Sequence, residues 1–275
     1  MIAVLAIYVA LVSEGAPYIL DWFLNGFGMI WRPSANLYGI NILIFNTFYA
    51  GIGCIAFSTI IGLPTAIYLA EFAGTKLRNI VKPCLEVLTG FPSVIIGIIG
   101  AVIVLSAINT IGGSTAGGGI LAIWIVLGTM SIPTVVTISE DAIKAVTKDL
   151  KEASLGLGAT RWQTVVRVII PAAMPGILAA ILLGLGNAMG ETMAASFIVG
   201  TIDSTKLSLD LVHGTQLIPV EIIRAASGDW GADKLEPYYA AGFVLFVIIG
   251  ALNLIIRRLS KEKSAVSPSK KRVLR

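Results

Sequence analysis

Few residues of this chain have side chains suited to catalysis, and their spacing excludes most kinds of active site. The single histidine, His213, and the two cysteines, Cys54 and Cys84, do not form the closely spaced clusters that bind metal ions. The glycine run from Gly112 to Gly119 lacks the following Lys-Ser/Thr pair of a phosphate-binding loop and predicts a tight turn instead. We therefore expect no catalytic residue, no metal and no cofactor, and any ATP hydrolysis must come from another chain.

One carboxylate lies inside a long apolar run. Glu191 falls within the run from Ala172 to Val199, and a charge placed in hydrocarbon costs enough free energy to indicate a function. Asn187 precedes it by one helical turn and lies on the same helix face, and Thr192 follows it. Two interpretations stay open: Glu191 and Asn187 join helices by hydrogen bonds, or, with Thr192, they line a translocation pathway.

A polar, basic segment, Lys151 to Pro171, separates two apolar runs. Its first part predicts a short helix, and Gly158 then allows the backbone to turn sharply. The apolar stripe of a second helix follows at three- and four-residue spacing, at Trp162, Val165, Val166 and Ile169. Pro171 predicts a bend or a restart before the next apolar run. By periodicity alone this hairpin is only a connector between two membrane segments.

The elements that position these residues are membrane helices. Of the 275 residues, 56% are hydrophobic and 13% are charged, and the mean hydropathy is +0.88. A span needs roughly 20 apolar residues, which predicts an all-α polytopic membrane protein with about six transmembrane helices. The expected spans are Ile40–Leu69, Leu85–Ile111, Gly118–Ile138, Ala172–Val199, Pro237–Ile256 and the shorter Met1–Val12. The last of these is either a signal peptide or a first span that extends through Phe23.

Basic residues set the expected orientation. Sixteen of the 20 Lys and Arg residues lie in the loop Glu71 to Pro83, in the central loop and in the tail after Ile256. The other four are Arg32, Lys206, Arg224 and Lys234. The positive-inside rule places both termini and the two basic loops in the cytoplasm. The net charge of +4 then reflects topology and contact with anionic membrane lipid, with no indication of nucleic-acid binding.

The polar segment resembles the EAA loop of binding-protein-dependent ABC transporter permeases. Their pattern is EAA, three residues, Gly, nine residues, Ile, one residue and Leu-Pro. The chain matches this spacing at Glu152, Ala153, Ser154, Gly158, Val168, Ile170 and Pro171. The resemblance implies a MetI-like permease core whose short helix docks into a cleft of an ATPase subunit. It implies that the ATPase-coupling residues are Glu152, Ala153, Ser154, Gly158 and Pro171.

Other segments resemble the phosphate-specific permeases of the PstC type. They include Trp31 and Pro33, Ala66–Glu71, Phe91–Gly97 and Gly184–Met193. The resemblance implies phosphate as the substrate, a PstA-like sister permease that completes a heterodimer, two ATPase subunits and an external phosphate-binding protein. A permease for another oxyanion or small solute is the alternative. A secondary transporter is a further one, against which the EAA loop argues.

If the substrate is phosphate, Glu191 has a specific expected role in anion selection. Phosphate keeps a proton at neutral pH, so an ionised Glu191 can accept its hydrogen bond and disfavour a fully deprotonated oxyanion. The family often has an arginine where this chain has Asn187, so an intramembrane cation would have to come from the sister permease.

The expected organisation has three parts. Residues 1–36 form a first transmembrane segment and an external loop, and residues 37–258 form the ABC transporter transmembrane domain with its EAA coupling loop at 139–171. Residues 259–275 form a cytoplasmic basic tail. The external segment Asp203 to Glu236 has mixed charge. Four of its charged residues are expected either in a solvated loop or against a binding protein: Asp210, Glu221, Arg224 and Asp229.

Overall fold

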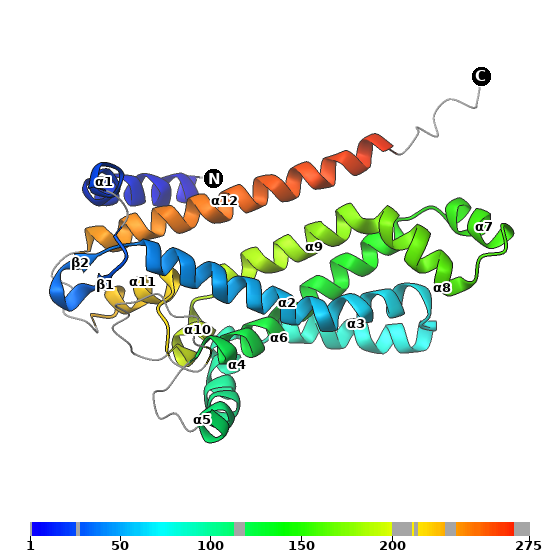
Figure 1. The fold of residues 1–275 in the computed structure, drawn as a ribbon, viewed down its shortest axis with the longest axis horizontal. Helices are drawn as coiled ribbons and strands as arrows, with labels where there is room; N and C mark the ends of the chain where they lie inside the picture. Colours follow the sequence, from blue (N-terminus) through cyan, green and yellow to red (C-terminus); the bar gives the residue numbers. More distant parts are fainter. Residues whose placement is uncertain are drawn as a thin grey trace. The chain divides into compact units, whose positions relative to one another are not determined.

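The protein is helical through most of its length in the computed structural model, which describes residues 2–25, 28–112, 119–199, 211, 214–228 and 235–266 (Figure 1). The α-helices are α1 (Ile2–Asn25), α2 (Asn41–Glu71), α3 (Thr75–Gly90), α4 (Ser93–Ile99), α5 (Ser106–Gly112), α6 (Ile120–Lys144), α7 (Lys148–Gly156), α8 (Arg161–Thr164), α9 (Ile170–Gly190), α10 (Met193–Ile198), α11 (Ile218–Ala226) and α12 (Glu236–Val266). Two π-helical segments, Gly100–Leu105 and Val165–Ile169, join α4 to α5 and α8 to α9. The strands β1 (Trp31–Arg32) and β2 (Leu37–Tyr38) form a small antiparallel hairpin, in which Trp31 is opposite Tyr38.

Five helical segments of the described chain are long and apolar enough to cross a membrane. They are Leu5–Leu24, Asn41–Glu71, Ile120–Lys144, Arg161–Gly190 and Glu236–Ile256. The bent pair Thr75–Gly90 and Ser93–Ile108 makes a sixth if it counts as one span. The prediction of an all-α protein with about six transmembrane helices is confirmed, and the first span extends through Phe23 as expected.

Two of the predicted spans are interrupted. The expected span Leu85–Ile111 breaks at Phe91 and Pro92, because proline lacks an N–H and disfavours helical backbone in the residue before it. The expected span Ala172–Val199 ends at Gly190 and resumes at Met193 as α10. Glu191 therefore lies in a break between two helices, and the prediction of one continuous helix around it is wrong.

The chain folds into two compact units that do not follow its order. The first unit contains residues 1–57, 91–129 and 187–250, and the second contains residues 58–90, 130–186 and 251–275. Four helices, α2, α6, α9 and α12, continue from one unit into the other. The ranges of the second unit hold the same sixteen Lys and Arg residues that the sequence assigns to one side of the membrane.

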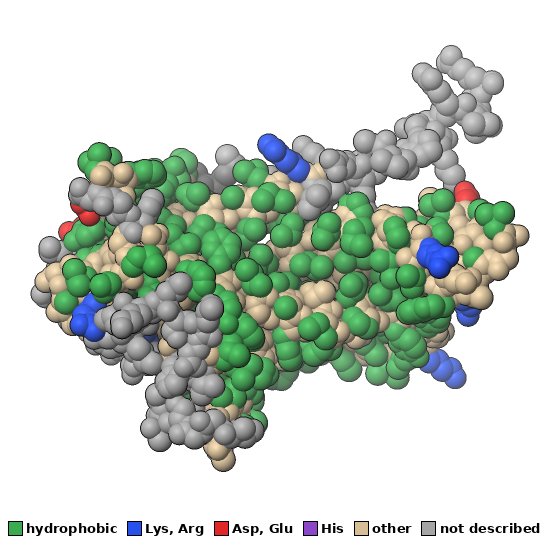
Figure 2. All heavy atoms as spheres, in the orientation of Figure 1, with side chains coloured by type: hydrophobic (Ala, Val, Ile, Leu, Met, Phe, Trp, Pro, Cys, Tyr) green, Lys and Arg blue, Asp and Glu red, His purple; other side chains and the backbone are tan. Residues whose placement is uncertain are grey.

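The second unit has an aliphatic core. Val165, Ile169 and Ile177 pack against Ile143 of α6, and a neighbouring cluster joins Ala66 and Leu69 of α2 to Val136 of α6. Large apolar side chains also remain exposed, Ile60 and Leu254 in this unit and Val102 and Ile103 in the first. Figure 2 shows hydrophobic side chains over much of the visible surface, as expected of helices that face lipid.

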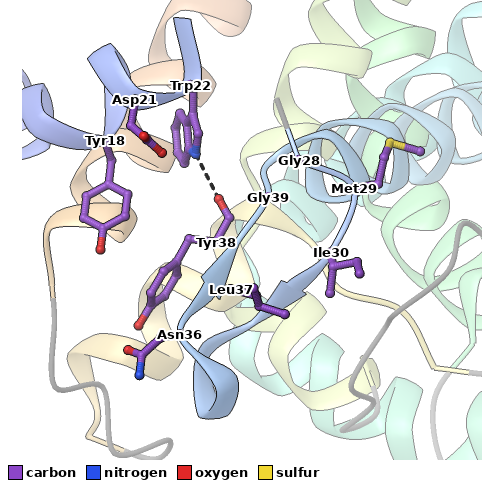
Figure 3. A pocket seen from close by; sticks show the side chains of 10 residues that line it. All are labelled: Tyr18, Asp21, Trp22, Gly28, Met29, Ile30, Asn36, Leu37, Tyr38 and Gly39. Atoms are coloured by element: carbon purple, nitrogen blue, oxygen red, sulfur yellow. Dashed lines mark hydrogen bonds between the residues drawn. The ribbon is translucent and has the colours of Figure 1, made fainter. Parts of the chain in front are cut away.

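The first unit has an aromatic core. Trp31 meets Tyr38 and Tyr238 edge to face, with ring centroids 5.5 and 5.4 Å apart. Trp22 of α1 donates a hydrogen bond from Nε1 to the Tyr38 carbonyl at 2.9 Å and so joins α1 to the hairpin. A pocket of about 390 Å³ lies beside these rings, between α1 and the hairpin (Figure 3). Ten residues line it: Tyr18, Asp21, Trp22, Gly28, Met29, Ile30, Asn36, Leu37, Tyr38 and Gly39.

Candidate functional site

The helix α7 and the turn that follows it form the expected short helix and glycine turn. Gly158 has φ +85°, a conformation that side chains with a Cβ atom rarely adopt. The Gly158 N–H donates to the Leu155 carbonyl at 3.0 Å, and the Ala159 N–H donates to the Ser154 carbonyl at 3.2 Å. This pair of bonds is the Schellman ending of a helix. The glycine turn predicted at Gly158 is confirmed.

One side of α7 is open. Glu152 and Ala153 are exposed, and three leucines of the same segment are also exposed: Leu150, Leu155 and Leu157. Ser154 is half-buried, and its Oγ lies 3.0 Å from Oγ1 of Thr164 on α8. Because α7 presents both polar and apolar side chains outward, it suits contact with another protein.

The second helix of the loop begins with a capping box. The Gln163 N–H donates to Oγ1 of Thr160, and the Thr160 N–H donates to the Gln163 side chain. The predicted apolar stripe is half correct: Val165 and Ile169 are buried, whereas Trp162 and Val166 are exposed. The exposed Trp162 ring lies 6.4 Å from the ring of Phe72, which follows α2.

Of the two alternatives predicted at Pro171, a bend or a restart, the restart does not occur. The helical segment from Arg161 to Gly190 passes through it as one candidate span. The π-helical segment Val165–Ile169 lies directly before it. Such a widened turn removes the clash between the proline ring and the carbonyl four residues earlier, here that of Arg167. The span therefore begins at Arg161 rather than Ala172.

Two side chains attach α7 to the rest of the second unit. One is Ser154, through Thr164. The other is Lys151, whose ammonium group donates to Oε2 of Glu71 at the end of α2. The Glu71 side chain is only 10% exposed. The sequence comparison included Glu71 in a resembling motif but assigned it no role.

A buried carboxylate joins α3 to α6. Glu140 is 1% exposed and is surrounded by cations: Arg78 Nε lies 3.0 Å from its Oε1, Lys82 Nζ lies 3.3 Å from its Oε2, and Lys144 pairs with it one turn along α6. The sequence interpretation missed this cluster. Its signature is two pairs at i,i+4 spacing, Arg78 with Lys82 and Glu140 with Lys144, but spacing alone does not show that the two helices meet.

The predicted pathway residues lie in the first unit, at the break after α9. Glu191 is half-buried, and its Oε1 accepts a hydrogen bond from the Ala194 N–H at 3.2 Å, which caps the start of α10. Thr192 donates from Oγ1 to the Gly190 carbonyl at 3.2 Å. Asn187 is exposed on the last turn of α9. Among the contacts of the described residues, no hydrogen bond joins Asn187 to Glu191.

Helix α11 holds a buried ion pair. Glu221 is 4% exposed and accepts hydrogen bonds from Arg224 at 3.1 Å and from Trp31 Nε1 at 3.2 Å. Arg224 also donates to the Val199 carbonyl at 3.2 Å. The prediction that Glu221 and Arg224 lie in a solvated loop is wrong, because both are enclosed by the first unit. Asp210, Asp229 and His213 lie outside the described residues.

The two candidate sites contain different kinds of groups. The predicted coupling residues, Glu152 to Pro171, belong to the second unit, and the predicted pathway residues Asn187, Glu191 and Thr192 belong to the first. Within the described part of the chain, no group of three or more His, Cys, Asp or Glu side chains is placed to hold a metal ion. The available chemistry consists of hydrogen bonding and ion pairing.

Comparison with known proteins agrees with this arrangement. Residues 62–264 match the family described as "Binding-protein-dependent transport system inner membrane component". The chain is 33% identical over 235 residues to the "Probable ABC transporter permease protein YqgH" of Bacillus subtilis (strain 168), covering 85% of this chain and 76% of that protein. It is 30% identical over 260 residues to the "Phosphate transport system permease protein PstC" of Xylella fastidiosa (strain 9a5c), covering 85% and 78%.

A solved structure shows the same fold. The structure is an inward-facing conformation of the MetNI methionine ABC transporter, and the TM-score is 0.62 at 19% identity, covering 81% of this chain and 96% of that one. The chain therefore belongs to the family of binding-protein-dependent transport system inner membrane components: it is a multi-pass, non-catalytic permease subunit of an ABC importer, which works with a sister permease, a separate ATPase and a substrate-binding protein.

Proposed function

We propose that this chain is the PstC-like half of a heterodimeric permease that imports inorganic phosphate. The observation that carries the substrate is its 30% identity to the PstC protein of Xylella fastidiosa over 85% of this chain. A PstA-like sister permease completes the pathway, two ATPase subunits drive it and an external phosphate-binding protein delivers the anion.

The coupling loop is the contact with the ATPase in this proposal. The exposed Glu152 and Ala153, the outward-facing leucines of α7 and the left-handed turn at Gly158 support the assignment. Ser154 and Pro171 belong to the same matched pattern. Ser154 holds α7 against α8 through Thr164, and Pro171 follows the π-helical segment by which α8 continues into α9.

The orientation follows from charge. The loop Glu71 to Pro83, the central loop and the tail after Ile256, which hold sixteen Lys and Arg residues, face the cytoplasm. Both termini are then cytoplasmic if the bent pair α3 and α4 counts as one span, which gives six. This orientation presents α7 to a cytoplasmic ATPase.

The pathway residues are Glu191, Asn187 and Thr192. The break between α9 and α10 supports this role, because non-helical backbone at membrane depth is tolerated where it lines a cavity or is buried in protein. Glu191 accepts only the α10 N–H among the described contacts. A carboxylate can accept hydrogen bonds from more donors than this one. Glu191 can therefore also accept a hydrogen bond from the hydroxyl group of protonated phosphate.

Reconstitution tests the proposal directly. Vesicles are prepared with this chain, its sister permease and the ATPase, with ATP enclosed and with the binding protein and radiolabelled phosphate outside. They should accumulate the phosphate, and vesicles without ATP should not. Sulfate should neither enter nor compete. Uptake of sulfate or of an organic solute in place of phosphate would show a permease for another substrate, and uptake without ATP would show a secondary transporter.

A further inference from the structure

The attachment of α7 to α2 has a consequence for coupling. Among the described residues of α7, Lys151 and Ser154 form side-chain hydrogen bonds with other helices. Ser154 contacts Thr164 in the same loop. Thr164 lies in the first turn of the helical segment Arg161–Gly190, whereas Lys151 contacts a different membrane-spanning helix, α2, through Glu71.

The surroundings of Glu71 favour this ion pair. Glu71 is 10% exposed and Lys151 is 33% exposed, so water screens their attraction less than it screens a surface pair. Glu71 is also the last residue of α2. The ammonium group of Lys151 therefore lies at the carboxyl end of a long helix, where unpaired carbonyls carry partial negative charge.

The helix that follows α2 in the chain has its own ion pairs, which do not involve α7. The helix α3 begins at Thr75, shortly after Glu71, and its Arg78 and Lys82 pair with the buried Glu140 of α6. These contacts connect α3 to α6 without involving α7. Through side-chain charge, α7 is thus connected to α2, and α3 is connected to α6.

The helix α2 can carry a displacement over a distance. It runs without interruption for 31 residues from Asn41, in the first unit, to Glu71, in the second. Near its other end, the Thr47 hydroxyl accepts a hydrogen bond from the Ile218 N–H at the start of α11, at 3.1 Å. A continuous helix transmits a displacement of one of its ends, whereas a flexible loop would absorb the movement.

We propose that the ion pair between Lys151 and Glu71 is the contact through which a displacement of α7 moves α2, so that both are positioning residues for coupling. The inference rests on the proposed function of α7 as the element that contacts the ATPase. It assigns the mechanical link to two charged side chains outside the matched EAA pattern.

Charge exchange tests this link in the reconstituted transporter. The variants are Lys151→Glu, Glu71→Lys and the double exchange, with Lys76→Glu as a control because Lys76 is exposed and undergoes the same charge change. The measured quantities are phosphate taken up per ATP hydrolysed and the amount of ATPase that co-purifies. Each single variant should lower the uptake per ATP by about fivefold or more and still retain the ATPase. The double exchange should restore most of the ratio, and Lys76→Glu should leave it unchanged.

The outcomes separate the inference from the proposed function. If the wild-type transporter neither binds the ATPase nor takes up phosphate, the proposed function fails. If the wild type is coupled, three results overturn the link: unchanged single variants, single variants that lose the ATPase, and a double exchange that restores nothing.

A covalent link provides a second measurement. In a background with Cys54→Ala and Cys84→Ser, Lys151→Cys and Glu71→Cys can be joined by a short bis-maleimide. Before joining, this variant lacks the ion pair and should show lowered uptake per ATP. Because the inferred contact moves as one body, joining the two cysteines should restore coupled uptake. A ratio that stays low or falls further on joining would contradict the link.

Discussion

Glu191 is an acidic residue that also caps a helix. Its Oε1 caps α10 through the Ala194 N–H, and its position in the break between α9 and α10 lies in a largely apolar stretch of the chain. The cap explains part of the reason for an acid here, but a neutral amide or hydroxyl can cap a helix as well. The negative charge is the property that capping does not require.

Glu191→Gln separates the two roles. The glutamine oxygen can still accept the Ala194 N–H, so helix α10 and assembly with the ATPase should remain intact. Phosphate uptake should be lost, because a neutral amide neither selects the protonated anion nor repels a fully deprotonated one. Uptake and co-purification of the ATPase are measured together.

Glu86→Gln, at an exposed position of α3, is the matched control and should behave as wild type. Unchanged phosphate uptake and anion selectivity in Glu191→Gln would reduce Glu191 to a helix cap.

Removing the charge of the buried Glu140 should lower the stability of the protein. Glu140→Gln leaves Arg78, Lys82 and Lys144 close together without the carboxylate that they share. The three cations are partly exposed, so water compensates in part, and we expect a loss of about 1–3 kcal/mol. Thermal unfolding of the purified protein in detergent should show a lower midpoint.

Asp141→Asn is the control for this charge removal. Asp141 is adjacent in the sequence, but its side chain is 64% exposed and lies 3.7 Å from Lys82. An exposed pair of this kind contributes about 1 kcal/mol or less. Equal shifts in the two variants would contradict the role given to burial.

At the scale of the element, the Gly158 turn sets the direction in which the chain leaves α7. No atom lies within 4 Å of a Cβ built on Gly158, but its φ is +85°. Gly158→Val therefore meets no steric contact and still forces a β-branched residue into left-handed backbone, which costs about 1–2 kcal/mol. The turn should distort, and ATP hydrolysis should become uncoupled from transport or the ATPase should fail to bind.

Gly156→Ala isolates the backbone effect. Gly156 is helical, and a Cβ there also meets nothing within 4 Å. Since alanine favours the helix relative to glycine, this variant should transport normally and be slightly more stable. Normal coupled uptake by Gly158→Val, measured as phosphate taken up per ATP hydrolysed, would remove the turn from the coupling mechanism.

The contact of α4 with α10 requires a glycine for a different reason. A Cβ on Gly97 would lie 2.7 Å from Cα of Ala194, which is backbone and cannot rotate away. Gly97→Ala should push α4 from the helix that Glu191 caps and should cost about 1–3 kcal/mol. Gly90→Ala, where a Cβ meets nothing within 4 Å, should be neutral in thermal unfolding and in uptake. A Gly97→Ala protein with wild-type stability would show that α4 and α10 are less tightly packed.

Helices with continuous apolar sequence could be predicted closely, and interruptions could not. The expected span Ile40–Leu69 became α2, Asn41–Glu71, because its apolar composition and the polar residues at its ends agree. The breaks at Phe91–Pro92 and at Glu191–Thr192 lie within apolar runs, so hydropathy does not detect them. The restart allowed for at Pro171 does not occur, because a π-helical segment directly before it continues the helix.

The candidate site shows the same division. The spacing of the coupling loop predicted α7 and the Gly158 turn, since both depend on neighbours in the sequence. The pairing of Lys151 with Glu71, and of Glu140 with Arg78 and Lys82, joins residues far apart in the chain. No local pattern specifies such contacts, which arise only when packed helices bring the charges together.

At the scale of the whole molecule, charge and fold partition the chain in the same way. The boundary between the two compact units depends only on contacts, whereas the positive-inside rule depends only on sequence. Sixteen of the 20 Lys and Arg residues nevertheless fall in the ranges of the second unit. This agreement supports one membrane orientation for both units, with α7 in the cytoplasm and α11 outside.

Cysteine labelling can test the orientation residue by residue. In the background with Cys54→Ala and Cys84→Ser, one reporter is Lys148→Cys at the start of α7 and the other is Ser227→Cys directly after α11; both positions are exposed. A membrane-impermeant maleimide should label Ser227→Cys in intact cells or right-side-out vesicles and Lys148→Cys only in inside-out vesicles. The reverse labelling pattern would show that the protein has the opposite membrane orientation, in which a cytoplasmic ATPase could not contact α7. Labelling of both reporters from one side would contradict the topology, because it requires an even number of crossings between them, whereas one candidate span, Arg161–Gly190, lies between the two positions.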